Sequence, residues 1–312
     1  MEYEVELMDL ERSKELRTKY YSQDLFSTKA DISGLCIELI TADKNHTDMW
    51  KDNFYAMSEH IKAHAKIYSI KDETMEMKVL FEPATNVAFL FNFDYYGWIK
   101  SIGLGISGNI LEESHNIYSI HGAALDIDGV GLTLIAPSKT GKTTQSWGLL
   151  RAKNAHMISD DWYFVKLGIG RPAVFGSEKN CYIDADIGDV WEEYKPLIRN
   201  IRFDNEGRGI ANVRCTAGES SVITRTTMHY IILMKRDPFD PETIRKLTSE
   251  EGVKYMIEND MCNPHQMVRS EHKINLRKKF IAEYFSACDI YLVNTIESAK
   301  KTQELIRNIV LD

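Results

Sequence analysis

A lysine, several hydroxyls and a pair of carboxylates lie at spacings that suit phosphate chemistry. The segment 136–144, APSKTGKTT, follows an apolar run and precedes a helical pattern over 144–152. In a phosphate-binding loop, backbone N–H groups and a helix N-terminus hold phosphate oxygens, a lysine reaches the terminal phosphates and a hydroxyl contacts magnesium. Lys142 and Thr143 fit these last two roles. We therefore expect a nucleotide site at Pro137, Ser138, Lys139, Thr140, Gly141, Lys142, Thr143 and Thr144.

Two observations bear on whether this motif is a functional phosphate-binding loop. The strict pattern has glycine where this chain has Ala136, and a G-K-T sequence at a helix start also arises by chance. The acidic pair Asp160-Asp161, in HMISDDWYFV, begins 18 residues after Lys142 (160 − 142 = 18) and is flanked by apolar residues. Carboxylates at the carboxyl end of a neighbouring strand are where such folds hold magnesium and a catalytic base. The pair therefore favours a functional loop.

Composition bounds the class of protein. The chain has 312 residues and an ordinary globular composition, with 38 Lys and Arg against 46 Asp and Glu and a net charge of −8. We expect no nucleic-acid or membrane partner, because nothing in this balance attracts polyanions. Five scattered cysteines without a C-x-x-C pair argue against disulfides or structural zinc. The acidic start lacks the features of a signal peptide, so a cytoplasmic location is expected.

The elements that position these residues are expected in two domains, 1–114 and 115–312. In the first, of α+β type, we predict strands at 34–40 and 78–81 and helices at 50–64 and 96–113, and we interpret Asn45-His46-Thr47 as a loop. Phe54, Met57, Ile61 and Ala65 are spaced to share one face of the first helix. In the second, of α/β type, Asp128-Gly129 predicts a hairpin within 123–136. Further strands are expected at 162–167, 228–234 and 290–294, and helices at 273–285 and 298–309.

The second domain resembles a known family. Three segments in the same order carry the likeness to the catalytic core of HPr kinase/phosphorylase: 121–131 (HGAALDIDGVG), the phosphate loop, and 158–161 (ISDD). The loop is also similar to that of ATP-using phosphoenolpyruvate carboxykinases, which share a nucleotide-binding core with the kinases. The resemblance covers about residues 115–215 and includes 206–213 (EGRGIANV), similar to a shortened second signature of the kinases. It implies an α/β fold with a P-loop nucleotide core.

The resemblance implies roles for individual residues. Asp160 would be the base that accepts the hydroxyl proton, and Asp161 with Thr143 would hold Mg²⁺, although the two carboxylates could exchange these roles. His121 and Arg208 match active-site positions of the kinase family. The cofactors implied are ATP and Mg²⁺, and because kinases of this type assemble as oligomers, self-association is implied as well.

The acceptor is less defined than the donor. Residues 1–114 match nothing in the kinase family, so HPr itself does not follow as the substrate. We expect an ATP-dependent kinase that phosphorylates a serine-type hydroxyl, on a protein or on a small molecule such as free serine. The alternatives are a nucleotide-binding regulatory module or NTPase, and a phosphorylase running the reverse reaction. His265 and Arg269 are candidate substrate contacts, against the plainer interpretation of a helix-preceding loop with a solvated basic face.

Overall fold

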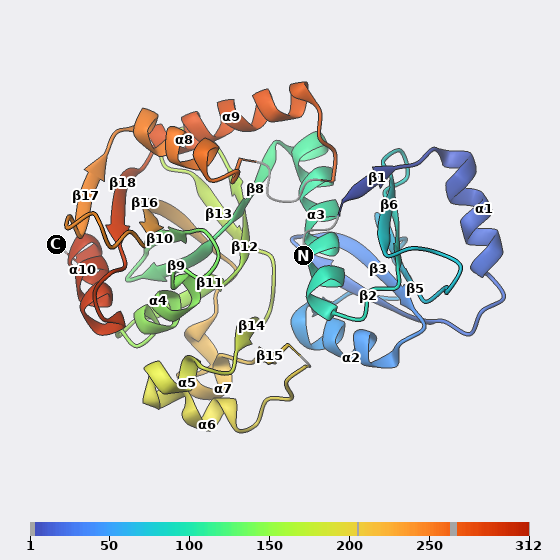
Figure 1. Cartoon of the computed structure of the whole chain (residues 1–312), viewed down its shortest axis with the longest axis horizontal. Helices are drawn as coiled ribbons and strands as arrows, with labels where there is room; N and C mark the ends of the chain where they lie inside the picture. The colour runs from blue at the N-terminus through green and yellow to red at the C-terminus, as the bar shows by residue number, and fades with distance from the viewer. Residues whose placement is uncertain (1–3, 205, 263–266, 312) are drawn as a thin grey trace. The chain divides into compact units, whose positions relative to one another are not determined.

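The computed structural model describes residues 4–204, 206–262 and 267–311 (Figure 1). The chain divides into two compact units, which we describe separately. The N-terminal unit runs to His115 and includes the segment that ends at Ser270. The C-terminal unit contains the rest of the chain from Asn116 onward. Both units are mixed α/β structures, so the expected α/β class is confirmed at this level.

The N-terminal unit is built on a seven-stranded sheet in the order β1-β6-β7-β5-β3-β2-β4. Its central strands β3, β5 and β7 run parallel, with antiparallel strands at their flanks. The strands are β1 (Val5–Leu7), β2 (Phe26–Ile32), β3 (Leu35–Thr41), β4 (Tyr55–Ala56), β5 (Ala65–Ile70), β6 (Lys78–Glu82) and β7 (Val87–Phe91). The parallel centre means that the carboxyl ends of three strands meet at one edge.

Helices cover both faces of this sheet. Leu16 and Tyr20 of α1 (Leu10–Tyr20) pack with Ile70 of β5 and Phe89 of β7 on one face. The opposite face, to which alternate residues of β5 point, carries α2 (Lys44–Asn53) and α3 (Tyr96–His115). A side chain at Gly103 of α3 would collide with the indole ring of Trp50 in α2. The glycine therefore lets these two helices approach closely.

One helix prediction in this unit is wrong. The apolar spacing over 50–64 predicted a helix there and a loop at Asn45-His46-Thr47, whereas α2 spans Lys44–Asn53 and β4 follows it. Asp43 caps the helix, because its side chain accepts a hydrogen bond from the Asn45 N–H at 2.8 Å. The buried stripe is His46, Thr47, Trp50 and Asn53, so the polar-looking segment begins the helix.

Asp72, just after β5, ties α1 to the sheet. Its carboxylate accepts hydrogen bonds from Lys19 Nζ at 2.7 Å and Tyr20 Oη at 2.6 Å. These bonds and those from Thr74 hold the pKa of Asp72 well below its ordinary value, with Lys19 as the largest cause. A depressed folded-state pKa adds stability at neutral pH that is lost on acidification below about pH 4. We expect Asp72→Asn to lower the melting temperature at pH 7 and to lower it by a smaller amount at pH 3, where part of the stabilisation is lost although the folded carboxylate stays ionised. Equal losses at the two pH values would contradict this.

The C-terminal unit contains a nine-stranded sheet. Along its main path the order is β11-β9-β10-β16-β13-β12-β8, and β18 pairs with both β16 and β17. Strands β10, β16 and β18 run parallel to one another. The strands are β8 (Ile117–His121), β9 (Ala123–Ile127), β10 (Val130–Ile135), β11 (Ala155–Ser159), β12 (Trp162–Lys166), β13 (Ala173–Gly176), β16 (Arg225–Lys235), β17 (Ile244–Leu247) and β18 (Asp289–Asn294).

Two helical layers enclose this sheet. Leu134 and Ile232 face α4 (Lys142–Leu149) and α10 (Ala299–Leu311), whereas Ile231 and Leu233 face α8 (Ser249–Glu258) and α9 (Glu271–Ser286). This alternation along β16 gives each face of the sheet its own apolar core. A smaller part carries the two-stranded sheet β14 (Cys181–Asp184) and β15 (Arg208–Ala211) with the short helices α5 (Ile187–Val190), α6 (Lys195–Ile198) and α7 (Arg214–Ala217).

Most elements expected in the C-terminal unit are confirmed. The hairpin β9–β10 turns at Asp128 and Gly129, whose φ angles are 53° and 83°. Both angles are positive, as a tight primed turn requires. The expected strands near 162–167, 228–234 and 290–294 and the helices near 273–285 and 298–309 are present as β12, β16, β18, α9 and α10.

Candidate functional site

The predicted phosphate loop connects β10 to α4 at the carboxyl edge of the parallel strands. Lys139 and Gly141 have φ angles of 64° and 100°, so the backbone turns through two left-handed residues before the helix. Gly141 is the N-cap and contributes no side chain. The Gln145 N–H donates to the Gly141 carbonyl at 3.0 Å, and α4 begins at Lys142. This arrangement leaves the positive end of α4 at the loop, as anion binding requires.

Residues distant in sequence fix this loop. The Thr295 hydroxyl, just after β18, donates to the Thr140 carbonyl at 2.9 Å, and Thr295 is only 4% exposed. The Thr295 N–H donates to the Lys235 carbonyl at the end of β16 at 2.8 Å. From α10, the Gln303 amide donates to the Gly148 carbonyl at 2.9 Å. The loop and α4 are therefore anchored to the ends of the two neighbouring parallel strands and to α10.

Replacing Thr295 tests this anchor. We expect Thr295→Val to weaken nucleotide binding by roughly fivefold, because losing one buried hydrogen bond costs about 1 kcal/mol. Thr295→Ser keeps the hydroxyl and should retain near-normal affinity. Titration of each variant with ATP, next to its melting temperature, measures the effect. If valine and serine variants bound nucleotide equally well, the loop would not depend on this hydroxyl.

The acidic pair lies between β11 and β12, next to the loop. Asp160 is 4% exposed, and its carboxylate accepts a hydrogen bond from the Ser146 hydroxyl of α4 at 2.6 Å. The Asp161 side chain is 29% exposed, and its Oδ1 lies 3.1 Å from Lys142 Nζ. Lys142 Nζ also donates to the Asp160 carbonyl at 3.3 Å. The two carboxylates thus have different surroundings, one facing α4 and the other the lysine.

His121 completes the cluster from the end of β8. Its Nε2 lies 3.1 Å from Asp161 Oδ1, and its ring stacks on Trp162 with centroids 4.8 Å apart. His121 and Trp162 are register partners on antiparallel β8 and β12, which explains why the rings meet. The Gly122 N–H donates to the Asp161 carbonyl at 2.9 Å, so the acidic turn is held from this side as well. His121, Lys142 and Asp161 form a contiguous polar group.

The remaining predicted residues lie elsewhere or outside the description. Arg208 begins β15, where its Nε donates to Asp184 Oδ1 at 2.8 Å on the two-stranded sheet. Arg269 is exposed and belongs to the N-terminal unit, and His265 lies outside the described residues. Pro137 and Thr143 are half-buried, Thr140 is buried, and Ser138 and Lys139 are exposed on the loop. The roles of Arg208, His265 and Arg269 stay predictions.

Sequence reasoning missed several residues that shape the site. Ser146 lies one helical turn after Lys142, and that spacing could have marked it as facing the acidic pair. The Ser177 hydroxyl, after β13, donates to the Trp162 carbonyl at 2.7 Å. This bond holds the residue that directly follows the acidic pair. Thr295 carries no motif. The only sequence signal for Thr295 is its position just after β18. This strand runs parallel to β16 and to β10, the strand that precedes the loop.

The donor set suits magnesium. Thr143 offers a hydroxyl on the first turn of α4, and two carboxylates lie in the adjoining turn. Mg²⁺ in nucleotide sites is usually held by one or two protein oxygens together with phosphate oxygens and water, so a larger cage of side chains is not needed. The residues present therefore fit the metal that the resemblance implies.

Comparisons with known proteins add no assignment. No protein-family model matches the chain, and no curated protein matches its sequence. Among the described residues, no helix combines the length and apolar character needed to cross a bilayer. A functional conclusion must therefore rest on the site itself.

Proposed function

We propose that the chain is an ATP-dependent kinase of the HPr-kinase type, which transfers the γ-phosphate to a serine-type hydroxyl on a protein or a small molecule. One observation carries the proposal. Lys142 extends from the start of α4, after a loop with two left-handed residues, to the acidic turn that also contacts His121. The cluster brings a phosphate-binding helix terminus, a cation and carboxylates together, as phosphoryl transfer requires.

The surroundings of the two carboxylates favour an exchange of the roles first expected. A base must reach the acceptor hydroxyl, and Asp161 is the more exposed carboxylate, beside His121. Asp160 is buried and bonded to Ser146, which directs it toward α4 and the loop. We assign Asp161 as the base. Asp160 and Thr143 would then hold the magnesium ion. His121 would then orient the Asp161 carboxylate toward the acceptor.

Each residue has a physical task in this scheme. The loop N–H groups and the N-terminus of α4 hold the phosphates, and Lys142 neutralises charge on the phosphoryl group as it moves. Asp160 and Thr143 would hold magnesium, which would offset the negative charge of the phosphates. The proton of the acceptor hydroxyl passes to the Asp161 carboxylate as the new O–P bond forms, and ADP leaves. Stacking on Trp162 keeps the His121 ring in one orientation during phosphoryl transfer.

A labelling experiment tests the proposal. The protein is incubated with γ-labelled ATP and Mg²⁺, once with a fractionated protein extract and once with a pool of small molecules that includes serine. Label on a protein or on a small molecule supports the kinase and identifies the acceptor class. Label released only as free phosphate would instead make the chain an NTPase or a regulatory nucleotide module. No turnover and no ATP binding would reject the nucleotide site altogether.

A further inference from the structure

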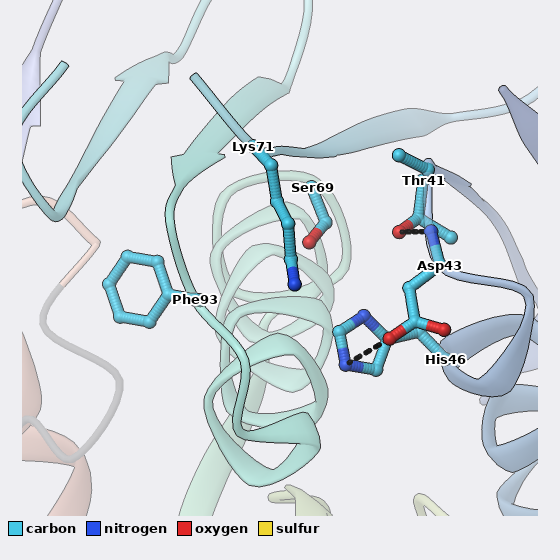
Figure 2. Close-up of a pocket in the computed structure, with 7 residues that line it drawn as sticks. Thr41, Asp43, His46, Ser69, Lys71 and Phe93 are labelled. Atoms are coloured by element: carbon cyan, nitrogen blue, oxygen red, sulfur yellow. Dashed lines mark hydrogen bonds and ion pairs between the residues drawn. The ribbon is translucent and has the colours of Figure 1, made fainter. Parts of the chain in front are cut away.

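The N-terminal unit contains a polar cavity of about 170 Å³ that the phosphate chemistry does not use. It lies at the carboxyl ends of the parallel strands β3 and β5, beside the start of α2 (Figure 2). Thr41 and Ser69 are register partners at the ends of these strands. In open α/β sheets, ligands bind outside the carboxyl ends of the strands, so this position is a favourable one. The lining residues are Thr41, Ala42, Asp43, His46, Ser69, Lys71 and Phe93.

His46 gives the cavity an unused hydrogen-bonding atom. The residue is 3% exposed, and its Nε2 lies 3.2 Å from the Asp94 carbonyl oxygen. A carbonyl oxygen can only accept, so Nε2 carries a hydrogen, and the same nitrogen lies 3.8 Å from Asp43 Oδ2. Nδ1 is buried and has no hydrogen-bond partner among the described residues. In Figure 2 the edge of the ring that carries Nδ1 faces the side of the cavity lined by Ser69 and Lys71. Buried polar atoms are nearly always satisfied, so this one points to a ligand.

The charges of the lining are arranged in two groups. Figure 2 shows Lys71 and Ser69 on the β5 side and Asp43 and His46 on the α2 side. Among the lining residues, Lys71 is the only cation and Asp43 the only anion. Lys71 pairs with Asp94 at 2.7 Å, but both side chains are largely exposed, at 63% and 79%. Such a surface pair contributes little energy, so Lys71 can exchange it for a ligand.

We infer that this cavity binds a small free α-amino acid in its zwitterionic form. The ligand carboxylate would pair with Lys71 and accept from the Ser69 hydroxyl. The ligand ammonium would face Asp43, and the ligand side chain would lie toward Phe93. A zwitterion offers an opposite charge to both Lys71 and Asp43, whereas a ligand of one charge offers it to only one of them. The volume corresponds to about six water molecules, which suits a small amino acid such as alanine.

Calorimetric titration of the full chain without nucleotide tests this inference. L-Alanine, L-valine, L-aspartate and glycine are suitable probes, because they have no hydroxyl and cannot act as the serine-type acceptor of the proposed kinase. We expect at least one to bind. Its N-acetyl derivative lacks the ammonium and its methyl ester lacks the carboxylate, so each should bind at least about tenfold more weakly.

Variants locate the binding. We expect Lys71→Met and Asp43→Asn each to weaken binding by about tenfold or more. Asparagine is an equally good helix cap, so Asp43→Asn should leave α2 intact. Lys66→Met is the matched control, because Lys66 is a charged residue of β5 that pairs with Glu38 and does not line the cavity. The Lys66→Met variant should bind the amino acid with normal affinity. The Lys142→Ala variant should do the same, since this cavity is independent of the proposed kinase chemistry.

The inference has clear contrary results. It is overturned if none of the four amino acids binds at millimolar concentration, or if a derivative lacking one charge binds as tightly as its parent. Unchanged affinity in both Lys71→Met and Asp43→Asn would place the binding elsewhere. Displacement of the amino acid by inorganic phosphate, with phosphate binding lost in Lys71→Met, would make this an anion site instead.

Discussion

Replacing Lys142 by alanine is expected to remove measurable phosphoryl transfer and to weaken ATP binding strongly. Lys142 is the cation at the start of α4, and its ammonium is largely buried between the Asp160 carbonyl and the Asp161 carboxylate. Truncating one partner of a buried charged hydrogen bond costs about 2–5 kcal/mol, or roughly thirty- to several-thousand-fold. Turnover of γ-labelled ATP and titration with ATP both measure the loss.

The control for this variant is Lys153→Ala. Lys153 is exposed in the turn after α4, so its removal should change neither binding nor turnover. Unaltered melting temperatures would show that both variants fold. Normal ATP affinity together with full turnover in Lys142→Ala would reject the phosphate-loop interpretation and, with it, the proposed function.

The second large effect is expected at Asp161. With this residue as the base, Asp161→Asn should lower the rate of transfer by about 10²–10⁴-fold, the range for general acid–base groups. ATP affinity should stay within a few-fold of normal, because the loop and Lys142 remain. Single-turnover transfer rates at saturating ATP separate the chemical step from binding.

Asp160→Asn is the matched comparison. Asparagine can still accept from the Ser146 hydroxyl, so the turn should keep its shape, and the loss should be smaller and should depend on magnesium concentration. If Asp160→Asn lost more of the transfer rate than Asp161→Asn at saturating magnesium, the base would be Asp160, as the resemblance to the kinase family implies. Equal full activity in both variants would remove the acidic pair from the mechanism.

The local part of the site could be predicted from the sequence, whereas its tertiary support could not. Lys142, Gly141 and the acidic pair are marked by residue type and by order along the chain, and the structure brings Lys142 and Asp161 to 3.1 Å. The assignment of Asp160 and Asp161 depends on burial, because adjacent residues of identical type have the same sequence signal. Ser146 and Thr295 act through contacts that only the folded sheet creates.

The N-terminal unit shows how a periodic pattern can mislead. Phe54 and Ala65 are both buried, as their spacing suggested, but Phe54 is the C-cap of α2 and Ala65 begins β5. Met57 and Ile61 lie outside any helix, and Ile61 is largely exposed. The stronger local signal was the cap at Asp43, which starts α2 and directs the buried His46 toward the polar cavity. Helix boundaries are better read from caps than from apolar spacing where the two disagree.

The link between Thr295 and Thr140 also sets an order of events during synthesis of the chain. The two residues are 155 positions apart in sequence. At roughly 5–20 residues per second, the ribosome needs about 8–30 s to add the residues between them. During that interval the nascent loop has its own turn residues but lacks β18 and α10. If the loop binds ATP as proposed, capture would therefore come late, after the nascent chain has completed the sheet, and ATP would stabilise only the finished C-terminal unit.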